Sequence, residues 1–164
     1  MINMSLVRAM KFAAMVVAGL SLAACSTNPN QMAGANAGLA GSAAPGSAQD
    51  FVVNVGDRVF FESDSSELTP QSIATLDKQA QWLGRYNRYA FTVEGHADER
   101  GTREYNIALG QKRADAVKNL MLLLGATEIQ IETVSFGKEK PRREGHDEAS
   151  WAENRRVDIV HAGE

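Results

Sequence analysis

A cluster of charged residues stands in the middle of the chain, where His96, Asp98, Glu99 and Arg100 occur within five positions. Such a mixture serves general acid–base catalysis, metal binding or recognition of a ligand that carries both charges. The rest of the sequence does not favour the first two. It contains no H-E-x-x-H, G-x-S-x-G or P-loop motif, and its single cysteine excludes a cysteine-based zinc site. We therefore expect no enzyme activity, no metal and no cofactor.

The third kind of chemistry depends on the residues that follow the cluster. Asn106, Leu109 and Arg113 have the i, i+3, i+7 spacing that places side chains on one stripe of a helix. The N-terminus of this helix, at Thr102, offers unpaired N–H groups that attract an anion. With Asp98 for an ammonium and Arg113 for a carboxylate, the region would form a receptor for an amino acid head group. A plain Asp–Arg salt bridge is the alternative.

The other charged residues of this turn have a simpler interpretation. They are expected to be solvated surface charges: Glu99, Arg100, Arg103 and Glu104. His96 is expected either to join the binding chemistry or to be a strand-end histidine that is hydrogen-bonded to the backbone.

Hydrophobic periodicity indicates the elements that must position these residues. The strand-like segments are residues 51–55, 58–61, 89–94, 129–136 and 156–160. One helix begins at Pro70 with Thr69 as its N-cap, and a second runs from about Arg103 to Leu124. Residues 138–153 are interpreted as a polar loop. The order β-α-β-α-β-β predicts one α+β domain over residues 51–164, with a mixed sheet packed against helices.

The first 24 residues have the layout of a secretory signal peptide. Arg8 and Lys11 precede an apolar run from Phe12 to Ala24, whose 13 residues fall short of the roughly 20 that a membrane-spanning helix needs. Cleavage after residue 24 removes two basic and no acidic residues, so the formal net charge changes from −3 to −5. This negative charge disfavours non-specific binding to nucleic acid, so we expect no nucleic acid partner.

The only cysteine, Cys25, follows Leu22-Ala23-Ala24, and this stretch resembles the lipobox of bacterial lipoproteins. In that family the thiol receives diacylglycerol, and the new amine is acylated with a fatty acid such as palmitate. A stray thiol is the alternative, although an unpaired thiol is a liability in an exported protein. Ser26 follows, which in the enterobacterial signal favours the outer membrane. Residues 25–50, rich in Ala, Gly and Ser, are predicted to be the lipidated cysteine and a flexible tether.

Three stretches carry a resemblance to a known family: GHADERGTREYNIALGQKRADAVKNLM, TVSFGKEKP and NRRVDIV. In this order they resemble the peptidoglycan-associated lipoproteins of the OmpA-like superfamily. The resemblance implies an OmpA-like β-α-β-α-β-β sandwich in the periplasm, lipid-anchored to the outer membrane, that binds the diaminopimelate of peptidoglycan non-covalently. It also implies TolB and other Tol proteins as partners, and a role in outer-membrane integrity and in constriction during cell division. The alternative is a protein-interaction module that binds TolB without contact with the cell wall.

The same resemblance implies roles for individual residues. They are Asp98 and Arg113, which hold the diaminopimelate zwitterion, Asn106 and Leu109, which line the same cleft, and Asp64, in the loop that closes it. Arg156 matches a family arginine that braces the site without touching the ligand. The chain departs from the family at Ser63, where many relatives have an aromatic residue, so the apolar wall expected from this loop is missing.

Overall fold

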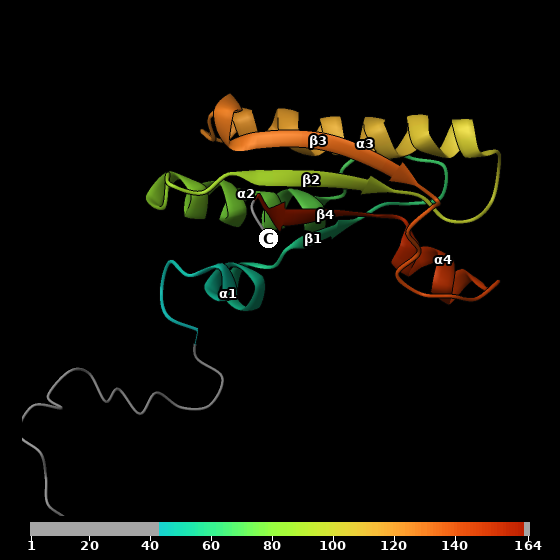
Figure 1. Cartoon of the computed structure of the whole chain (residues 1–164), viewed down its shortest axis with the longest axis horizontal. Helices are drawn as coiled ribbons and strands as arrows, with labels where there is room; N and C mark the ends of the chain where they lie inside the picture. Colours follow the sequence, from blue (N-terminus) through green and yellow to red (C-terminus); the bar gives the residue numbers. More distant parts are fainter. Residues whose placement is uncertain (1–42, 163–164) are drawn as a thin grey trace, which may run out of the picture. The chain divides into compact units, whose positions relative to one another are not determined.

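The computed structural model describes residues 43–162 of the 164-residue chain (Figure 1). The predicted signal peptide, Cys25 and the tether up to residue 42 lie outside the described residues. Within residues 43–162, none of the helices combines the length and the apolar character that crossing a membrane requires.

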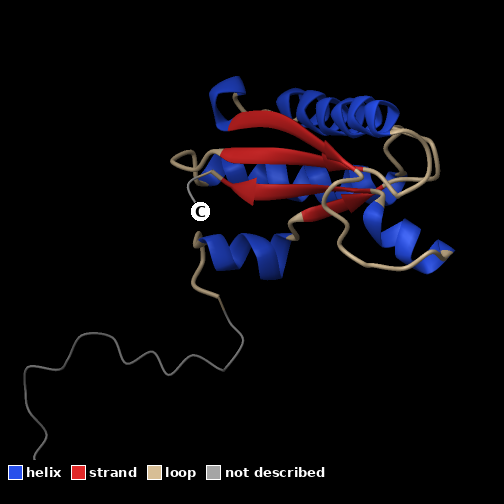
Figure 2. Cartoon of the chain, turned by 45° about the vertical axis from the view of Figure 1, so that its right-hand side comes forward, coloured by secondary structure: helices blue, strands red, loops and turns tan. Residues whose placement is uncertain are grey.

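The described part is built from two long helices, several short ones and one four-stranded sheet. Along the chain the elements are α1 (Ala48–Asp50), η1 (Phe51–Val55), β1 (Arg58–Phe60), α2 (Pro70–Arg85), β2 (Phe91–His96), α3 (Arg103–Leu123), η2 (Glu128–Gln130), β3 (Ile131–Gly137), α4 (Glu148–Asn154) and β4 (Arg156–His161). The strands follow the order β1-β4-β2-β3, with β2 and β3 parallel and β4 antiparallel to β1 and β2. Figure 2 shows α2 and α3 lying along this sheet. The predicted α+β class is therefore confirmed.

The core lies between the sheet and the two long helices. On β2, Phe91 and Val93 are buried whereas Thr92 and Glu94 are partly exposed, which is the period-two pattern of a strand with one covered face. On α3, Ala114, Val117 and Met121 are fully buried and recur at helical spacing. Burying a large apolar side chain stabilises a fold by about 1.5–3 kcal/mol. The core therefore fixes which stripe of α3 faces the sheet.

Two glycines let α3 approach β2 closely. A Cβ atom on Gly95 would stand 1.9 Å from the carbonyl oxygen of Gly110, and one on Gly110 would stand 2.4 Å from Oγ of Ser135. Any side chain at these positions would push the helix away from the sheet. Because Gly95 comes three residues before Asp98, the close approach places the turn after β2 next to the first half of α3.

The starts of both long helices agree with the sequence-based expectation. The Thr69 hydroxyl accepts a hydrogen bond from the Ser72 N–H, and Pro70 follows at the first helical position. On α3 the Thr102 hydroxyl accepts from the Tyr105 N–H. Each cap satisfies one of the otherwise unpaired N–H groups of its helix and so fixes where the helix begins.

The strand predicted for residues 51–55 is wrong, because this segment is the π-helical η1. Its β-branched composition favours a strand, but only one of its side chains is fully buried. Phe51 is 1% exposed and packs against Trp82 and Phe91 at centroid distances of 5.1 and 4.6 Å, whereas Val52 and Val53 are 48% and 52% exposed. The burial of the single Phe51 ring, rather than a repeating buried face, therefore determines the conformation of residues 51–55.

The folded part extends back into the segment predicted to be a tether. Ser47 caps α1, and the Asp50 carboxylate accepts hydrogen bonds from Gly46 N–H (2.8 Å) and from Nε1 of Trp82 (2.9 Å). The Tyr89 hydroxyl donates to the Gly46 carbonyl at 2.8 Å. Residues 46–50 are thus fastened to the domain at the start of β2.

The predicted polar loop 138–153 contains the short helix α4. Asp147 is its N-cap, with Oδ1 accepting from the Ser150 N–H at 2.7 Å. At the other end, the Asn154 side chain accepts from the N–H groups of Arg142 and Arg143 and donates to the Arg143 carbonyl. The helix therefore organises the whole connection between β3 and β4.

Candidate functional site

A pocket of about 290 Å³ lies where the turn after β2 meets α3 and the loop after β1. Five of the predicted ligand residues line it: Asp64, Asp98, Asn106, Leu109 and Arg113. Thr102, the sixth, does not line the pocket and serves as the N-cap of α3. The lining also includes Ser63, Arg100 and Tyr105, for which the sequence predicted no ligand role.

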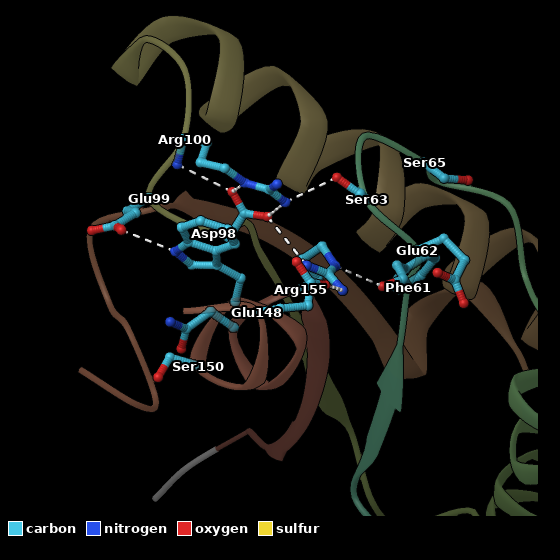
Figure 3. A network of polar contacts seen from close by, with 12 residues as sticks. Phe61, Glu62, Ser63, Ser65, Asp98, Glu99, Arg100, Glu148, Ser150 and Arg155 are labelled. Atoms are coloured by element: carbon cyan, nitrogen blue, oxygen red, sulfur yellow. Dashed lines mark hydrogen bonds and ion pairs between the residues drawn. The ribbon is translucent and has the colours of Figure 1, made fainter. Parts of the chain in front are cut away.

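Asp98 is the buried acid of the pocket, with 7% of its surface exposed (Figure 3). Its Oδ1 accepts from the backbone N–H and Nε of Arg100, both at 3.1 Å, and its Oδ2 accepts from Nη2 of Arg100 at 2.6 Å. Burial by itself raises the pKa of Asp98, but the hydrogen bonds and charge of Arg100, with the charge of Arg155, hold this pKa below its usual range. Asp98 is therefore an anion at neutral pH.

Arg113 is completely buried and braces the backbone around the pocket. Its guanidinium donates to the carbonyl oxygens of Ser65 (2.7 Å), His96 (2.8 Å) and Glu62 (3.0 Å). Burial lowers the pKa of Arg113 to about 10, although the nearby Asp98 carboxylate acts in the opposite direction, so the group stays charged at neutral pH. Three of its five N–H groups are used in these bonds, which leaves less for a carboxylate than the sequence suggested.

The turn between Asp98 and α3 is held from two sides. Nδ2 of Asn106, which is 2% exposed, donates to the Arg100 carbonyl at 2.8 Å. Nζ of Lys138 donates to the carbonyls of Glu99 and Gly101 at 3.2 and 2.7 Å. Gly101 has φ +91°, in the left-handed region that a residue with a side chain rarely adopts. Asn106 therefore shapes the pocket floor and also fixes the loop above it.

The loop after β1 closes the pocket through polar contacts. Asp64 adopts φ 56°, a left-handed conformation that Asp tolerates better than most residues, and it accepts a hydrogen bond from the Tyr105 hydroxyl. Oγ of Ser63 accepts from Nη2 of Arg100 at 2.9 Å. Where the family commonly has an aromatic wall, this chain has a hydroxyl that is bonded to an arginine.

The bracing arginine is Arg155, not Arg156 as the resemblance implied. Arg155 is 5% exposed, and its guanidinium donates to the Phe61 carbonyl (3.1 Å) and to Glu148 (2.7 Å) and lies 3.5 Å from Asp98. Arg156 instead donates to Asp158 at 2.8 Å. Neighbouring residues of an extended chain point in opposite directions, so the sequence NRR alone does not tell which arginine faces the site.

Glu99 and Arg100 are exposed at the surface as predicted, with 42% and 41% of their side chains accessible, but both also contact Trp151 of α4. Oε1 of Glu99 accepts from Nε1 of Trp151 at 2.9 Å, and its carboxylate pairs with Nδ1 of His146 at 2.8 Å. The guanidinium carbon of Arg100 stands 4.3 Å from the centroid of the Trp151 ring. A tryptophan inside a polar loop was the only sequence signal of this contact. Arg103 is also exposed as predicted, and it pairs with Glu139 at 3.2 Å.

His96 is the last residue of β2, and its ring makes none of the expected hydrogen bonds to the backbone. It is 1% exposed, stacks on Phe136 at 5.6 Å, and neither ring nitrogen has a hydrogen-bond partner among the described residues. Burial, followed by the charge of Arg156, lowers the pKa of His96 to about 4, so the ring is neutral at pH 7. In residues 43–162 no cluster of three or more His, Cys, Asp or Glu side chains is arranged to hold a metal ion.

Comparison with known proteins places this chain in a family. The model of the OmpA family matches residues 60–155. The peptidoglycan-associated lipoprotein of Rhizobium meliloti is 50% identical over 151 residues, which cover 90% of this chain and 85% of the relative. The corresponding protein of Pseudomonas aeruginosa is 42% identical over 164 residues, which cover 91% of this chain and 95% of the relative.

Solved structures agree with this placement. The peptidoglycan-associated lipoprotein from Burkholderia pseudomallei superimposes with a TM-score of 0.63 at 50% identity, covering 64% of this chain and 89% of that one. The C-terminal domain of Helicobacter pylori MotB gives 0.61 at 20% identity, covering 66% and 85%, which shows a shared fold alone. By domain, sequence and structure, the chain belongs to the OmpA family and groups there with the peptidoglycan-associated lipoproteins.

Proposed function

We propose that this chain is a lipoprotein of the outer membrane whose periplasmic domain binds peptidoglycan non-covalently. Its ligand group is the diaminopimelate of the stem peptide, whose side chain ends in an ammonium and a carboxylate on one carbon. One observation carries the proposal: the acid Asp98, the amide Asn106 and the guanidinium of Arg113, from two elements, all line the same pocket. The relatives that are about 50% identical are named peptidoglycan-associated lipoproteins, which supports peptidoglycan as the polymer that is bound.

The electrostatics of the pocket suit binding better than proton transfer. A general acid or base works best when its pKa lies near the operating pH. The pKa of Asp98 is held below its usual range, and that of Arg113 stays near 10, so both side chains keep their charge through the neutral range. We therefore propose a binding protein without catalytic activity, in which fixed opposite charges recognise the two ends of a zwitterion.

The attachment of the chain to the domain fits a bridge between membrane and wall. Gly46 is fastened to Tyr89 just before β2 begins, whereas Asp98 follows the other end of β2. At about 3.3 Å per residue, the strand sets these points roughly 20 Å apart. We propose that signal cleavage leaves Cys25 lipidated, that the lipid holds the outer membrane, and that the segment up to Gly46 provides the reach.

The proposal extends to protein partners on the strength of the family resemblance. TolB would bind a surface that overlaps the pocket, and the other Tol proteins would connect the chain to cell-envelope constriction during division. The rival possibility is a module that binds TolB and never touches the wall. The purified chain, in the absence of TolB, should bind the wall under our proposal and should not bind it under this alternative.

Co-sedimentation with purified, protein-free peptidoglycan sacculi tests the proposal. The chain lacking residues 1–25 should sediment with sacculi that contain diaminopimelate, and free meso-diaminopimelate should release it. Asp98→Asn keeps the size of the side chain but removes its charge, and we expect at least about a tenfold loss of binding, because losing one partner of a buried charge pair costs 2–5 kcal/mol.

Arg103→Gln is the matched control for this experiment, because Arg103 is an exposed arginine outside the pocket. It should sediment like the wild type. Sedimentation of Asp98→Asn at the wild-type level would remove the pocket from the proposal, and failure of the wild type to sediment at all would favour the TolB-only module.

A further inference from the structure

The acid that is expected to receive the ligand's ammonium already has a cationic partner within the chain. Asp98 accepts two hydrogen bonds from the Arg100 guanidinium and one from the Arg100 backbone N–H, and its side chain is only 8% exposed. A carboxylate in such surroundings has little free acceptor capacity. A ligand ammonium that reaches Asp98 must therefore take over at least one position that Arg100 occupies.

Arg100 differs from the other two arginines near the pocket in how it is held. Arg113 and Arg155 are at least nine-tenths buried and donate to main-chain carbonyls, which ties them to the fold. The side chain of Arg100 is 41% exposed, and its guanidinium donates only to the side chains of Asp98 and Ser63. It is therefore the guanidinium near this pocket that is free to move without breaking the backbone framework.

A second contact of Arg100 would keep its guanidinium near the pocket after its bonds to Asp98 are broken. Its guanidinium lies over the ring of Trp151, with 4.3 Å between the guanidinium carbon and the ring centroid, and this contact does not depend on Asp98. Stacking on an aromatic ring stabilises a cation by about 0.5–1 kcal/mol at an exposed site. In Figure 3, the Arg100 guanidinium lies between Asp98 and Ser63, and all three residues line the pocket.

We infer that Arg100 is the specificity-determining residue of this pocket and exchanges partners when the ligand binds. The ligand's ammonium replaces the Arg100 guanidinium on Asp98, and the released guanidinium turns to the ligand's carboxylate, which it binds together with Arg113. This inference rests on the proposed function and names its ligand class: side chains that end in an ammonium and a carboxylate on the same carbon.

The exchange explains why both charges are needed. A side chain with an ammonium alone, such as that of lysine, would displace Arg100 from Asp98 and give it no new anion. Leaving a charge without its partner in a partly desolvated site is unfavourable, so such a ligand is rejected. Arg100 thus competes with the ligand's ammonium for Asp98. Only a ligand that also carries a carboxylate gives the displaced guanidinium a new partner.

Two synthetic tripeptides test the inference: L-alanyl-γ-D-glutamyl-meso-diaminopimelate and the same peptide with L-lysine as its third residue. Isothermal titration of the chain lacking residues 1–25 gives a dissociation constant for each. We expect the wild type to prefer the diaminopimelate peptide by at least about tenfold, equivalent to 1.4 kcal/mol. In Arg100→Gln the lysine peptide should bind more tightly and the diaminopimelate peptide no better, so that the ratio falls to about threefold or less.

Arg103→Gln and Arg100→Lys are the controls. Arg103→Gln should keep the wild-type ratio, because this exposed arginine does not contact Asp98. Arg100→Lys keeps the charge but loses the planar fork, so its ratio should fall between those of the wild type and Arg100→Gln. A purely structural role would instead weaken both peptides by the same factor and leave the ratio unchanged.

The outcomes separate the inference from the function beneath it. If the wild type binds the diaminopimelate peptide and Arg100→Gln keeps the wild-type ratio, the exchange is wrong and the proposed function stands. The same holds if both peptides lose affinity equally. If the wild type binds neither peptide, the proposed function fails and the inference fails with it.

Discussion

The two ends of β2 are built from different kinds of side chain. Before and at its start, Tyr89 and Phe91 join Phe51 and Trp82 in an aromatic cluster with centroid distances of 4.6–6.5 Å. After its other end, the buried groups include the polar and charged Asp98, Asn106 and Arg113, and hydrogen bonds hold each of them, as the bonds from Arg100 hold Asp98. Packing therefore holds the domain together at one end, and a fixed arrangement of charges shapes a pocket at the other.

Because of this difference, stability and binding should depend on different residues. Aromatic burial depends on contact area and tolerates no cavity, but it does not read the charge of a ligand. Buried charges contribute less reliably to stability, because their desolvation cost offsets much of their attraction. Substitutions in the aromatic cluster should therefore change unfolding and leave the pocket unchanged, and substitutions at the pocket should mainly do the reverse.

Trp82→Ala should give the largest effect on stability. Trp82 is 6% exposed and contacts Phe51, Tyr86, Tyr89 and Phe91, and its indole N–H bonds to Asp50. Removing it should lower the free energy of unfolding by about 3–5 kcal/mol in urea titrations. The fraction that remains folded should bind the diaminopimelate tripeptide with the wild-type dissociation constant. A weakened constant in the folded fraction would show that the two ends are coupled.

Arg113→Met should lower both stability and binding, because this residue lines the pocket and also holds the backbone. Its loss leaves the carbonyls of Glu62, Ser65 and His96 without their donor, and unsatisfied buried groups cost about 1–3 kcal/mol each. We expect about 2–4 kcal/mol less stability in urea titrations, below the sum for three fully buried carbonyls, because the bonds to Ser65 and Glu62 are only partly buried. Binding should be lost as well. A stable variant that merely fails to bind would mean that the carbonyls find other donors.

A smaller effect on stability should come from pH, through His96 at the pocket end of β2. The pKa of His96 is lowered from 6.5 to about 4 in the folded chain, so the unfolded chain binds more protons between these values. Stability should therefore fall as the pH falls through this window, by about 1 kcal/mol between pH 7 and pH 5.5. Urea titrations at both pH values measure the change. His96→Gln removes the titrating group, and an unchanged pH slope in this variant would assign the effect to other residues.

Much of the pocket was predictable because its residues are close in sequence. Asp98 lies in the turn before α3, and Asn106, Leu109 and Arg113 share one stripe of that helix, so local geometry alone brings them together. Asp64 came only from the family resemblance, since nothing in its local sequence points to a cleft. The helix caps at Thr69 and Thr102, whose hydroxyls accept hydrogen bonds from N–H groups three residues further along, were equally local.

The contacts that sequence reasoning missed join residues far apart in the chain. Trp151 reaches Glu99 across 52 positions, and Arg155 reaches the Phe61 carbonyl across 94. No periodicity or spacing rule relates such residues before the strand register is known. The helical conformation of residues 51–55 has the same origin, because it depends on how Phe51 fits between Trp82 and Phe91. Local propensity cannot describe a contact that only the finished core creates.

The most direct test is a crystal structure of the chain lacking residues 1–25 with the diaminopimelate tripeptide. The account predicts that the terminal ammonium lies within hydrogen-bond distance of Asp98, in the pocket lined by Asn106 and Arg113. It also predicts that the Arg100 guanidinium has moved from Asp98 to the peptide's carboxylate. Electron density for the peptide on any other surface, with the Asp98 pocket unchanged, would contradict the account.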